Sequence, residues 1–342
     1  MPQTLMPQPC VDQRAIEIIG QHRLAQQTCL QRRGATDARG HIGRGHGMDR
    51  LLAALRPSGL YRQHIGRTPR MRAAAENLVP VTLELDGKCP VVVNEGFDIA
   101  TAAERTLTVK TFNAGQICLS PDYVMLPEGA VDGFVEAAKG FMARAFPKVQ
   151  DNNDYTSIIA PRHFDRLLDL IADAQAKGAT IVPLNPAGEP VHDVATRKIA
   201  PVLILNATED MRVMQEEIFG PLLPVVAMNV DQAIARINAH DRPLAAYLFS
   251  DSEAVQAQFG ASVTSGALVL NDIMSHASIE SLPFGGVGAS GIGAYHGVHG
   301  FRRFSHFRPT VRQSAEGLSG QRLRAPYADK QAALENLLGP RN

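Results

Sequence analysis

Hydrophobic and polar positions alternate regularly from Met71 onwards, and the pattern predicts strands and helices in turn. Residues 79–85 (VPVTLEL) place Val79, Val81 and Leu83 on one side, and this period of two predicts a strand. Short runs that are mainly apolar predict further strands, and the first of them, PVVVN, is expected to be buried. These runs are residues 90–94, 122–126, 180–184, 201–207, 222–228 and 266–271.

Segments with helical periodicity lie between these runs. Residues 164–179 (FDRLLDLIADAQAKGA) are strongly amphipathic, and residues 100–120 (ATAAERTLTVKTFNAGQICLS) predict one long helix with a glycine near its end. Further helices are predicted at 71–78, 130–146 and 231–241. Because strands and helices alternate, we expect an α/β fold with a mostly parallel sheet and helices on both faces.

The first seventy residues have a different composition from the rest. They contain eleven Arg, no Lys and four acidic residues, with little apolar periodicity. We expect a poorly ordered leader at residues 1–70. A basic arm that binds nucleic acid is a weaker alternative, because the Arg residues are spread evenly and not clustered.

The bulk composition excludes several classes of protein. Lys plus Arg and Asp plus Glu number 34 each in 342 residues, so net charge indicates neither a nucleic-acid nor a membrane partner. No apolar run approaches the roughly 20 residues of a membrane span, and the N-terminus has no signal-peptide core. The cysteines, Cys10, Cys29, Cys89 and Cys118, form no C-x-x-C pair. This spacing predicts no disulfides and no zinc site, and it fits a cytoplasmic location.

Two residues are candidates for catalysis. Cys118 lies in FNAGQICLSPDYV, and a thiolate is a strong nucleophile when its surroundings lower the pKa. Glu84, in LELDGK, follows a predicted strand and leads into a tight turn, where a carboxylate could activate water. The plain alternatives are a core cysteine and a solvated turn acid. Cys89, which directly follows Lys88, is expected to be a buried or strand-edge residue and not a second nucleophile.

Glu217 and Phe219 are candidates for binding a cofactor. They lie in QEEIFGPLLPV, where an acid, an aromatic residue, a glycine and a proline follow one another. Such a loop could place a carboxylate on a ribose with a ring beside it. The alternative is an ordinary connection between a helix and a strand.

A glycine-dense segment near the C-terminus, LPFGGVGASGIGAYHG, requires close backbone approach or positive φ at several positions. Its stretch 286–291 matches G-x-G-x-x-G. That fingerprint needs a strand before it, a helix after it and an acid about 20 residues on. Here the match follows a Leu-Pro-Phe loop and lies in the last fifth of the chain, so we reject a pyrophosphate site. The nearby histidines, His276, His296, His299 and His306, lack the spacing of a zinc site.

Four segments in this order, LELDGK, FNAGQICLSPDYV, EEIFGP and LPFGGVGASGIGAYHG, resemble the aldehyde dehydrogenase superfamily. The resemblance extends from Met71 to about Gln313. The continuation through GFRRFSH and the tail RLRAPYADKQAALENLL resemble the class-3-like branch, especially coniferyl aldehyde dehydrogenases. The resemblance implies an α/β, aldehyde dehydrogenase-like fold, with a catalytic α/β domain and an incomplete Rossmann-like cofactor domain.

The resemblance also implies roles for the candidate residues. Cys118 would attack the aldehyde to give a thiohemiacetal, hydride would pass to NAD or NADP, and the resulting thioester would be hydrolysed to the acid. Glu84 would be the general base for water, and Glu217 would hold the nicotinamide ribose with Phe219 next to the ring. The backbone N–H of Cys118 would supply half of the oxyanion hole. The implied partners are a small-molecule aldehyde and a second copy in a homodimer, with no metal.

The expected organisation has five segments. They are a non-matching leader (1–70), a remnant of the cofactor-binding domain (71–88), a catalytic domain (89–268), a return segment with the PFGG loop and an oligomerisation strand (269–312), and a tail (313–342).

The sequence also departs from the family pattern. It has no PWN segment to supply an oxyanion Asn and no upstream Lys for the adenosine ribose, and Asp86 stands where the family's LGGK has its first glycine. Back-translation of residues 55–70, read from the second base of each codon, permits FDHLVFTGSTSVGRHV, which resembles the family's cofactor loop. We therefore expect that the first seventy residues are out of frame. The alternative function is a catalytically impaired fragment acting at most as an oligomerisation or interaction module.

Overall fold

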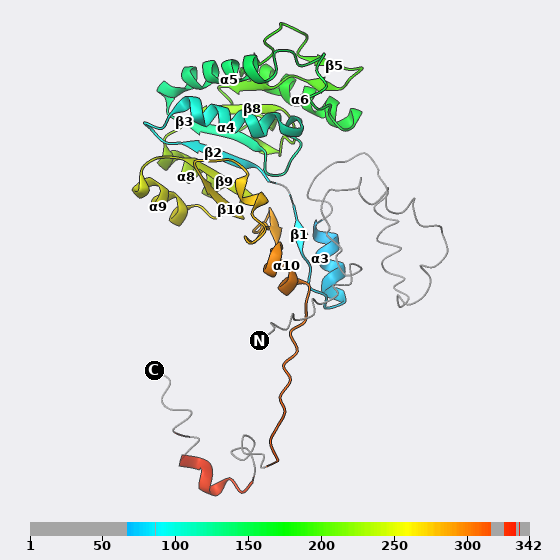
Figure 1. Cartoon of the computed structure of the whole chain (residues 1–342), viewed down its shortest axis with the longest axis vertical. Helices are drawn as coiled ribbons and strands as arrows, with labels where there is room; N and C mark the ends of the chain where they lie inside the picture. Colours follow the sequence, from blue (N-terminus) through cyan, green and yellow to red (C-terminus); the bar gives the residue numbers. More distant parts are fainter. Residues whose placement is uncertain (1–66, 86, 316–324, 333–334, 336–342) are drawn as a thin grey trace, which may run out of the picture. The chain divides into compact units, whose positions relative to one another are not determined.

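The computed structural model describes residues 67–85, 87–315, 325–332 and 335 (Figure 1). The predictions for the leader and for Asp86 therefore lie outside the described residues, apart from positions 67–70. The chain divides into two compact units, Met1–Phe304 and Ser305–Asn342. The described residues of the second include a short 3-10 helix, Ala328–Lys330. All candidate site residues belong to the first unit.

A seven-stranded sheet forms the centre of the first unit, in the order β10-β9-β2-β3-β8-β7-β4. Every neighbouring pair is parallel except β4 and β7, which are antiparallel. The strands are β2 (Cys89–Val93), β3 (Pro121–Leu126), β4 (Thr180–Pro183), β7 (Val202–Leu205), β8 (Leu222–Ala227), β9 (Ala245–Phe249) and β10 (Ala267–Leu270). The expectation of a mostly parallel sheet is confirmed.

The central strands are buried because their side chains are apolar on both faces. All residues of β2, β3 and β9 are buried, as expected for parallel strands that are covered on both sides. Around them lie the helices α4 (Ile99–Thr111), α5 (Val131–Ala145), α6 (Pro161–Ala176), α7 (Arg212–Gln215), α8 (Val230–Ala239) and α9 (Glu253–Ser262). None of the helices in the described part of the chain is long and apolar enough to cross a membrane.

Helix α6 shows how the sequence pattern becomes packing. Its buried residues, Phe164, Leu167, Leu170 and Ala174, recur at helical spacing on one face, and Pro161 occupies the first turn, where its missing N–H has no intrahelical acceptor. The predicted amphipathic helix is therefore confirmed.

The helix predicted over residues 100–120 is wrong in its last third. Helix α4 ends at Thr111, and residues Phe112–Gly115 form a 3-10 turn in which Asn113 and Ala114 have φ of 52° and 51°. A left-handed backbone cannot continue an α-helix. Ala114 is buried in the turn, so the apolar periodicity of the sequence continues past the end of the helix. The pattern alone therefore predicted a helix that is too long.

A two-stranded antiparallel sheet lies outside the main sheet. It pairs β1 (Leu83–Glu84) with β11 (Gly291–Ile292), with Glu84 opposite Gly291. The strand predicted over 79–85 is thus shorter than expected. The other short elements of the first unit include α3 (Arg67–Glu76), the hairpin β5 (His192–Asp193) and β6 (Lys198–Ile199), and α10 (Gly297–Arg303).

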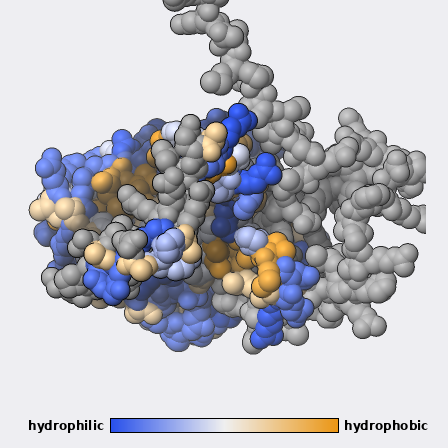
Figure 2. All heavy atoms as spheres, turned by 90° about the horizontal axis from the view of Figure 1, so that it is seen from below, coloured by the Kyte–Doolittle hydropathy of each residue, from blue (hydrophilic) through white to orange (hydrophobic). Residues whose placement is uncertain are grey.

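Exposed apolar side chains occur on and after α10. Val298, Phe301 and Phe304 are 49%, 53% and 37% exposed. On the face seen in Figure 2, apolar patches interrupt a mainly polar surface.

Candidate active site

Cys118 lies on the tight turn between α4 and β3, which we call the cysteine turn (residues 112–120). Two side chains close it: Asn113 Nδ2 donates to Gln116 O at 3.1 Å, and Gln116 Nε2 donates to Asn113 O at 3.0 Å. Gln116 also reaches the next loop, since its Oε1 accepts the N–H of Ile159 at 2.9 Å. The turn holds Cys118 half-buried at the carboxyl end of a helix and the start of a buried strand.

The backbone around Cys118 is fixed from the core side. The thiol of Cys89 donates to the carbonyl oxygen of Cys118 at 3.3 Å, and Tyr247 Oη donates to the carbonyl of Leu119 at 2.7 Å. Gly87 also lies against the carbonyl of Cys118, because a Cβ atom at Gly87 would be 2.5 Å from Cys118 O. Cys89 is fully buried at the start of β2, which agrees with its predicted status as a buried residue.

Glu84 ends strand β1 and is half-buried. Its carboxylate accepts a short hydrogen bond from the hydroxyl of Tyr295. Tyr295 lies in the segment AYHG, which sequence reasoning used only as part of a family motif. The missed signal was the antiparallel return of this glycine-rich segment beside the strand that carries Glu84.

Glu217 is buried in the loop between α7 and β8, and its Oε1 accepts the backbone N–H of Gly87 at 3.2 Å. We call residues 213–220 the Glu217 loop. Lys88 holds its backbone: Nζ donates to the carbonyls of Val213 at 2.7 Å and Glu216 at 3.1 Å, and to the Asp122 carboxylate. The segments LELDGK and EEIFGP therefore meet directly.

Asp122 and Arg166 also hold the Glu217 loop. Asp122 Oδ1 accepts the N–H of Ile218 at 2.9 Å, and Arg166 Nη1 donates to the carbonyl of Glu217 at 3.1 Å. Phe219 follows in a left-handed conformation with φ of 49° and is half-exposed. Such a backbone is uncommon for a bulky residue and persists where its surroundings fix it. These contacts give the loop one defined path.

The electrostatics around Cys118 favour the neutral thiol. Burial, which is the largest cause, and the charges of Glu84 and Glu217 together raise the pKa of Cys118 to about 12. Beneath the turn, burial lowers the pKa of Lys110 to about 7, and its Nζ donates to Pro121 O at 2.8 Å.

The glycine-dense segment is a tight backbone turn that supports β1. A Cβ atom at Gly285 would lie 2.0 Å from Gly293 O, and one at Gly291, which has φ of 154°, would lie 2.4 Å from Leu83 O. Its stretch 286–291 runs directly into the strand β11, and the helix α10 begins only at Gly297, six residues after the stretch ends. The backbone requirement predicted for these glycines is confirmed, and the context required for a pyrophosphate fingerprint is missing among the described elements.

The histidines of this region are in aromatic contacts. The rings of His276 and His296 stack on Phe284, with centroids 6.0 Å and 5.2 Å away. Within the described ranges, no group of three or more His, Cys, Asp or Glu residues could hold a metal ion.

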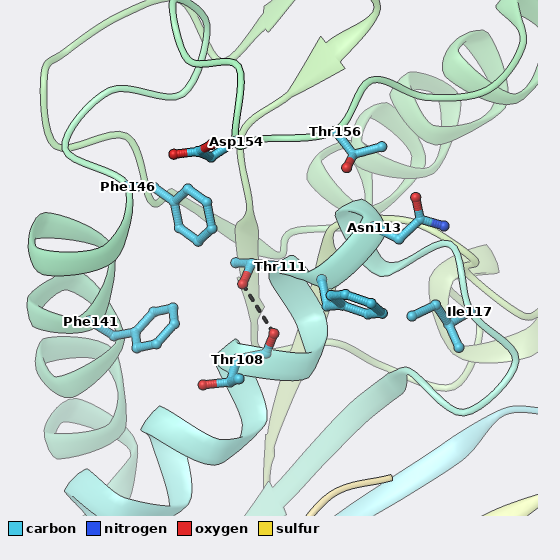
Figure 3. A pocket seen from close by; sticks show the side chains of 9 residues that line it. Thr108, Thr111, Asn113, Ile117, Phe141, Phe146, Asp154 and Thr156 are labelled. Carbon is cyan, nitrogen blue, oxygen red and sulfur yellow. Dashed lines mark hydrogen bonds between the residues drawn. The ribbon is translucent and has the colours of Figure 1, made fainter. Parts of the chain in front are cut away.

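An apolar groove of about 660 Å³ lies beside the cysteine turn (Figure 3). Phe112 and Ile117 of the turn line it, together with Phe141 of α5 and Phe146 behind that helix. Its polar lining comes from Thr108, Thr111, Asn113, Asp154 and Thr156. The groove therefore reaches the residue immediately before Cys118.

Comparison with known proteins agrees with this geometry. The model of the aldehyde dehydrogenase family matches residues 65–309. A coniferyl aldehyde dehydrogenase of Pseudomonas sp. (strain HR199 / DSM 7063) is 55% identical over 260 residues, covering 76% of this chain and 54% of that protein. Aldehyde dehydrogenase family 3 member A2 of Rattus norvegicus is 41% identical over 258 residues, covering 75% and 51%.

A substrate-bound structure of Staphylococcus aureus AldH superposes with a TM-score of 0.70 and 36% identity, covering 81% of this chain and 59% of that one. The chain thus has an aldehyde dehydrogenase fold and belongs to the aldehyde dehydrogenase family. It resembles coniferyl aldehyde dehydrogenases and class 3 enzymes, as the motifs predicted. It spans about half the length of the curated relatives that it matches.

Proposed function

We propose that the chain oxidises an aldehyde to a carboxylic acid with NAD or NADP, through a covalent thioester on Cys118. The observation that carries the proposal is the convergence of three segments at Gly87, which follows the strand that ends at Glu84, donates to the Glu217 carboxylate and lies against the carbonyl of Cys118. This convergence is what the chemistry requires: a nucleophile, a base within reach of water, and an acceptor for the cofactor's sugar.

The residues would act in two stages. The Cys118 sulfur bonds to the aldehyde carbon, and the backbone N–H of Cys118 stabilises the oxyanion that forms. After oxidation, Glu84 takes a proton from a water that attacks the thioester, the C–S bond breaks and the sulfur regains a proton. The raised pKa of Cys118 makes the resting form a thiol. The thiol must therefore lose its proton to a base, or gain a nearby positive charge, before it attacks.

The described residues fit the ribose end of a nicotinamide cofactor. Ribose hydroxyls donate hydrogen bonds, and the carboxylate of Glu217 can accept them. This carboxylate lies on a loop held by hydrogen bonds, and the half-exposed ring of Phe219 follows two residues later. Lys88 and Arg166 would preserve this arrangement by holding the loop carbonyls. When bound, the cofactor would accept the hydride.

The groove beside the cysteine turn supports an aromatic or long-chain aldehyde as the substrate. Three phenylalanine rings and Ile117 line it, and it is large enough for a phenylpropanoid. The name of the Pseudomonas relative gives coniferyl aldehyde as the first substrate to test. We also propose the segments predicted from sequence, with 71–88 serving the cofactor and 89–268 catalysis.

A second candidate function is an interaction module that pairs with another copy and turns over little or no substrate. Strand β10 lies at one end of the seven-stranded sheet, and its Leu268 and Leu270 are 39% and 40% exposed. An apolar edge strand favours pairing with another chain. The same surface is compatible with an active homodimer.

Two measurements test the proposal. Calorimetric titration with NAD and with NADP should show binding of at least one, and coniferyl aldehyde plus that cofactor should give a rise in NADH or NADPH absorbance. Binding without turnover would favour the interaction module with a preserved cofactor loop. Absence of both would contradict the enzymatic proposal.

A further inference from the structure

Tyr295 is the nearest described hydrogen-bond donor to the proposed general base. Its hydroxyl donates to Glu84 Oε1, and the two residues are 211 positions apart. Both side chains are half-buried, so the bond is only partly screened by water. A hydrogen bond from a neutral donor to a carboxylate is stronger than a bond between neutral groups.

The backbone fixes each partner separately. Glu84 pairs with Gly291 across β1 and β11, and the N–H of Leu85 donates to Ser290 O at 3.1 Å. Tyr295 exchanges two hydrogen bonds with Phe284, each of 2.8 Å. Two neighbouring positions are therefore set by backbone pairing, and the hydroxyl–carboxylate bond joins their side chains.

The ring of Tyr295 is also restrained. It packs edge-on against Phe284 and against His296, with centroids 5.5 Å and 5.0 Å away. Phe284 is nearly fully buried and anchors this group. The ring therefore has one available orientation, and its hydroxyl cannot follow the carboxylate far.

The residues just before strand β1 are also held by hydrogen bonds. Arg303 of α10 donates from Nε to Thr82 Oγ1 at 2.8 Å and from Nη2 to Val81 O. The C-terminal part of the first unit thus holds Glu84 through its strand and its side chain. Burial and the neighbouring Glu84 raise the pKa of Tyr295, so the hydroxyl keeps its proton and remains a donor at neutral pH.

We propose that Tyr295 is a positioning residue that holds the Glu84 carboxylate beside Cys118. The inference rests on the proposed function, because it gives Tyr295 a role only through Glu84 as the base. Tyr295 makes no bond to the substrate in this role. It restricts the rotamers of Glu84 and keeps one carboxylate oxygen engaged.

Hydrolysis of p-nitrophenyl acetate tests this role without a cofactor. The Cys118 sulfur bonds to the ester carbon, and p-nitrophenol leaves with the thiol proton. Water then attacks the acetyl thioester, Glu84 accepts a proton from it, the C–S bond breaks, and the proton returns to sulfur as acetic acid departs. The steady-state rate thus depends on both Cys118 and Glu84.

The variants are Tyr295→Phe, Glu84→Gln and the double variant. We expect Glu84→Gln to lower kcat by about 100-fold and Tyr295→Phe by about tenfold, with KM little changed. Because Tyr295 acts through Glu84, the double variant should be no slower than Glu84→Gln alone. A merely structural effect would add to that of Glu84→Gln.

A matched control is Thr101→Val, which removes a hydroxyl that donates to the Asp98 carboxylate at 2.5 Å, at the end of α4 farther from the cysteine turn. It should leave the rate per folded molecule unchanged. An unchanged rate in Tyr295→Phe, or additive losses in the double variant, would overturn the role of Tyr295 alone. If the wild-type protein does not hydrolyse the ester, or does so equally well after Cys118→Ala, both the proposed function and this role of Tyr295 are overturned.

Discussion

The backbone N–H of Gly87 donates to the carboxylate of Glu217 at 3.2 Å, across 130 positions of the sequence. Gly87 also lies against the carbonyl of Cys118, where an added Cβ would be only 2.5 Å away. Gly87 therefore lies between the segment of the proposed nucleophile, Cys118, and the proposed ribose acceptor, Glu217, and contacts both. Its lack of a side chain is what allows both contacts.

Gly87→Ala should displace the cysteine turn. The clash is with backbone, which cannot rotate away, so we expect a loss of roughly 1–3 kcal/mol in the free energy of unfolding and a large fall in kcat. Denaturant titration measures the first and turnover the second. Gly129→Ala is the matched control, because a Cβ there meets nothing within 4 Å. Equal stability of the two variants would contradict the close approach.

Lys88→Met should loosen the Glu217 loop. The ammonium serves two loop carbonyls and Asp122, whose side chain is 3% exposed. Leaving Asp122 without its cation should cost about 3–5 kcal/mol of stability, and the Kd for the nicotinamide cofactor should rise. Lys139→Met, which breaks an exposed pair with Glu136, should change stability little. If Lys88→Met bound the cofactor as the parent does, the loop would not depend on Lys88.

Cys118 should react slowly with iodoacetamide at neutral pH. Only the thiolate is alkylated, and burial together with Glu84 and Glu217 raises the pKa to about 12. The rate should therefore rise roughly tenfold per pH unit from about pH 7 to 9. Glu84→Gln removes one negative charge and should speed the reaction. Mass spectrometry of the Cys118 peptide gives the rate, and a plateau near pH 8 would contradict the raised pKa.

Phe112→Ala should weaken binding of aromatic aldehydes. Phe112 is 61% exposed in the groove, so its removal should leave folding intact and raise KM for coniferyl aldehyde by about two- to tenfold. The KM for acetaldehyde, which has no ring, should not change. Phe307→Ala is a control of similar exposure, 63%. Equal changes in KM for both aldehydes would show that the groove does not select the ring.

The sequence predicted the parts of the fold in which one periodicity persists. The apolar runs became β2, β3, β4, β7, β8 and β10, and the amphipathic segment became α6. The strand β9 and helix α9 were missed, since AAYLF resembles a buried segment of either type and α9 buries only Phe259. The end of α4 was misjudged because the left-handed turn at Asn113 and Ala114 is imposed by tertiary contacts.

For the candidate site, too, some residues could be predicted from the sequence and others could not. Motif order identified Cys118, Glu84, Glu217 and Phe219 as candidates. Their supports, among them Lys88, Asp122 and Tyr295, could not be predicted, because each acts through a contact between segments far apart in the chain. Spacing along the sequence carries no information about such pairs until the sheet order is known.

The role of Cys118 is tested most directly by the rate of NADH formation from coniferyl aldehyde and NAD, measured for the parent chain and for Cys118→Ala. We expect turnover by the parent and none by the variant, with folding unchanged because Cys118 is only half-buried. Turnover that survives in Cys118→Ala would contradict the thiol mechanism. A parent chain that binds cofactor and substrate yet forms no NADH would contradict the enzymatic function.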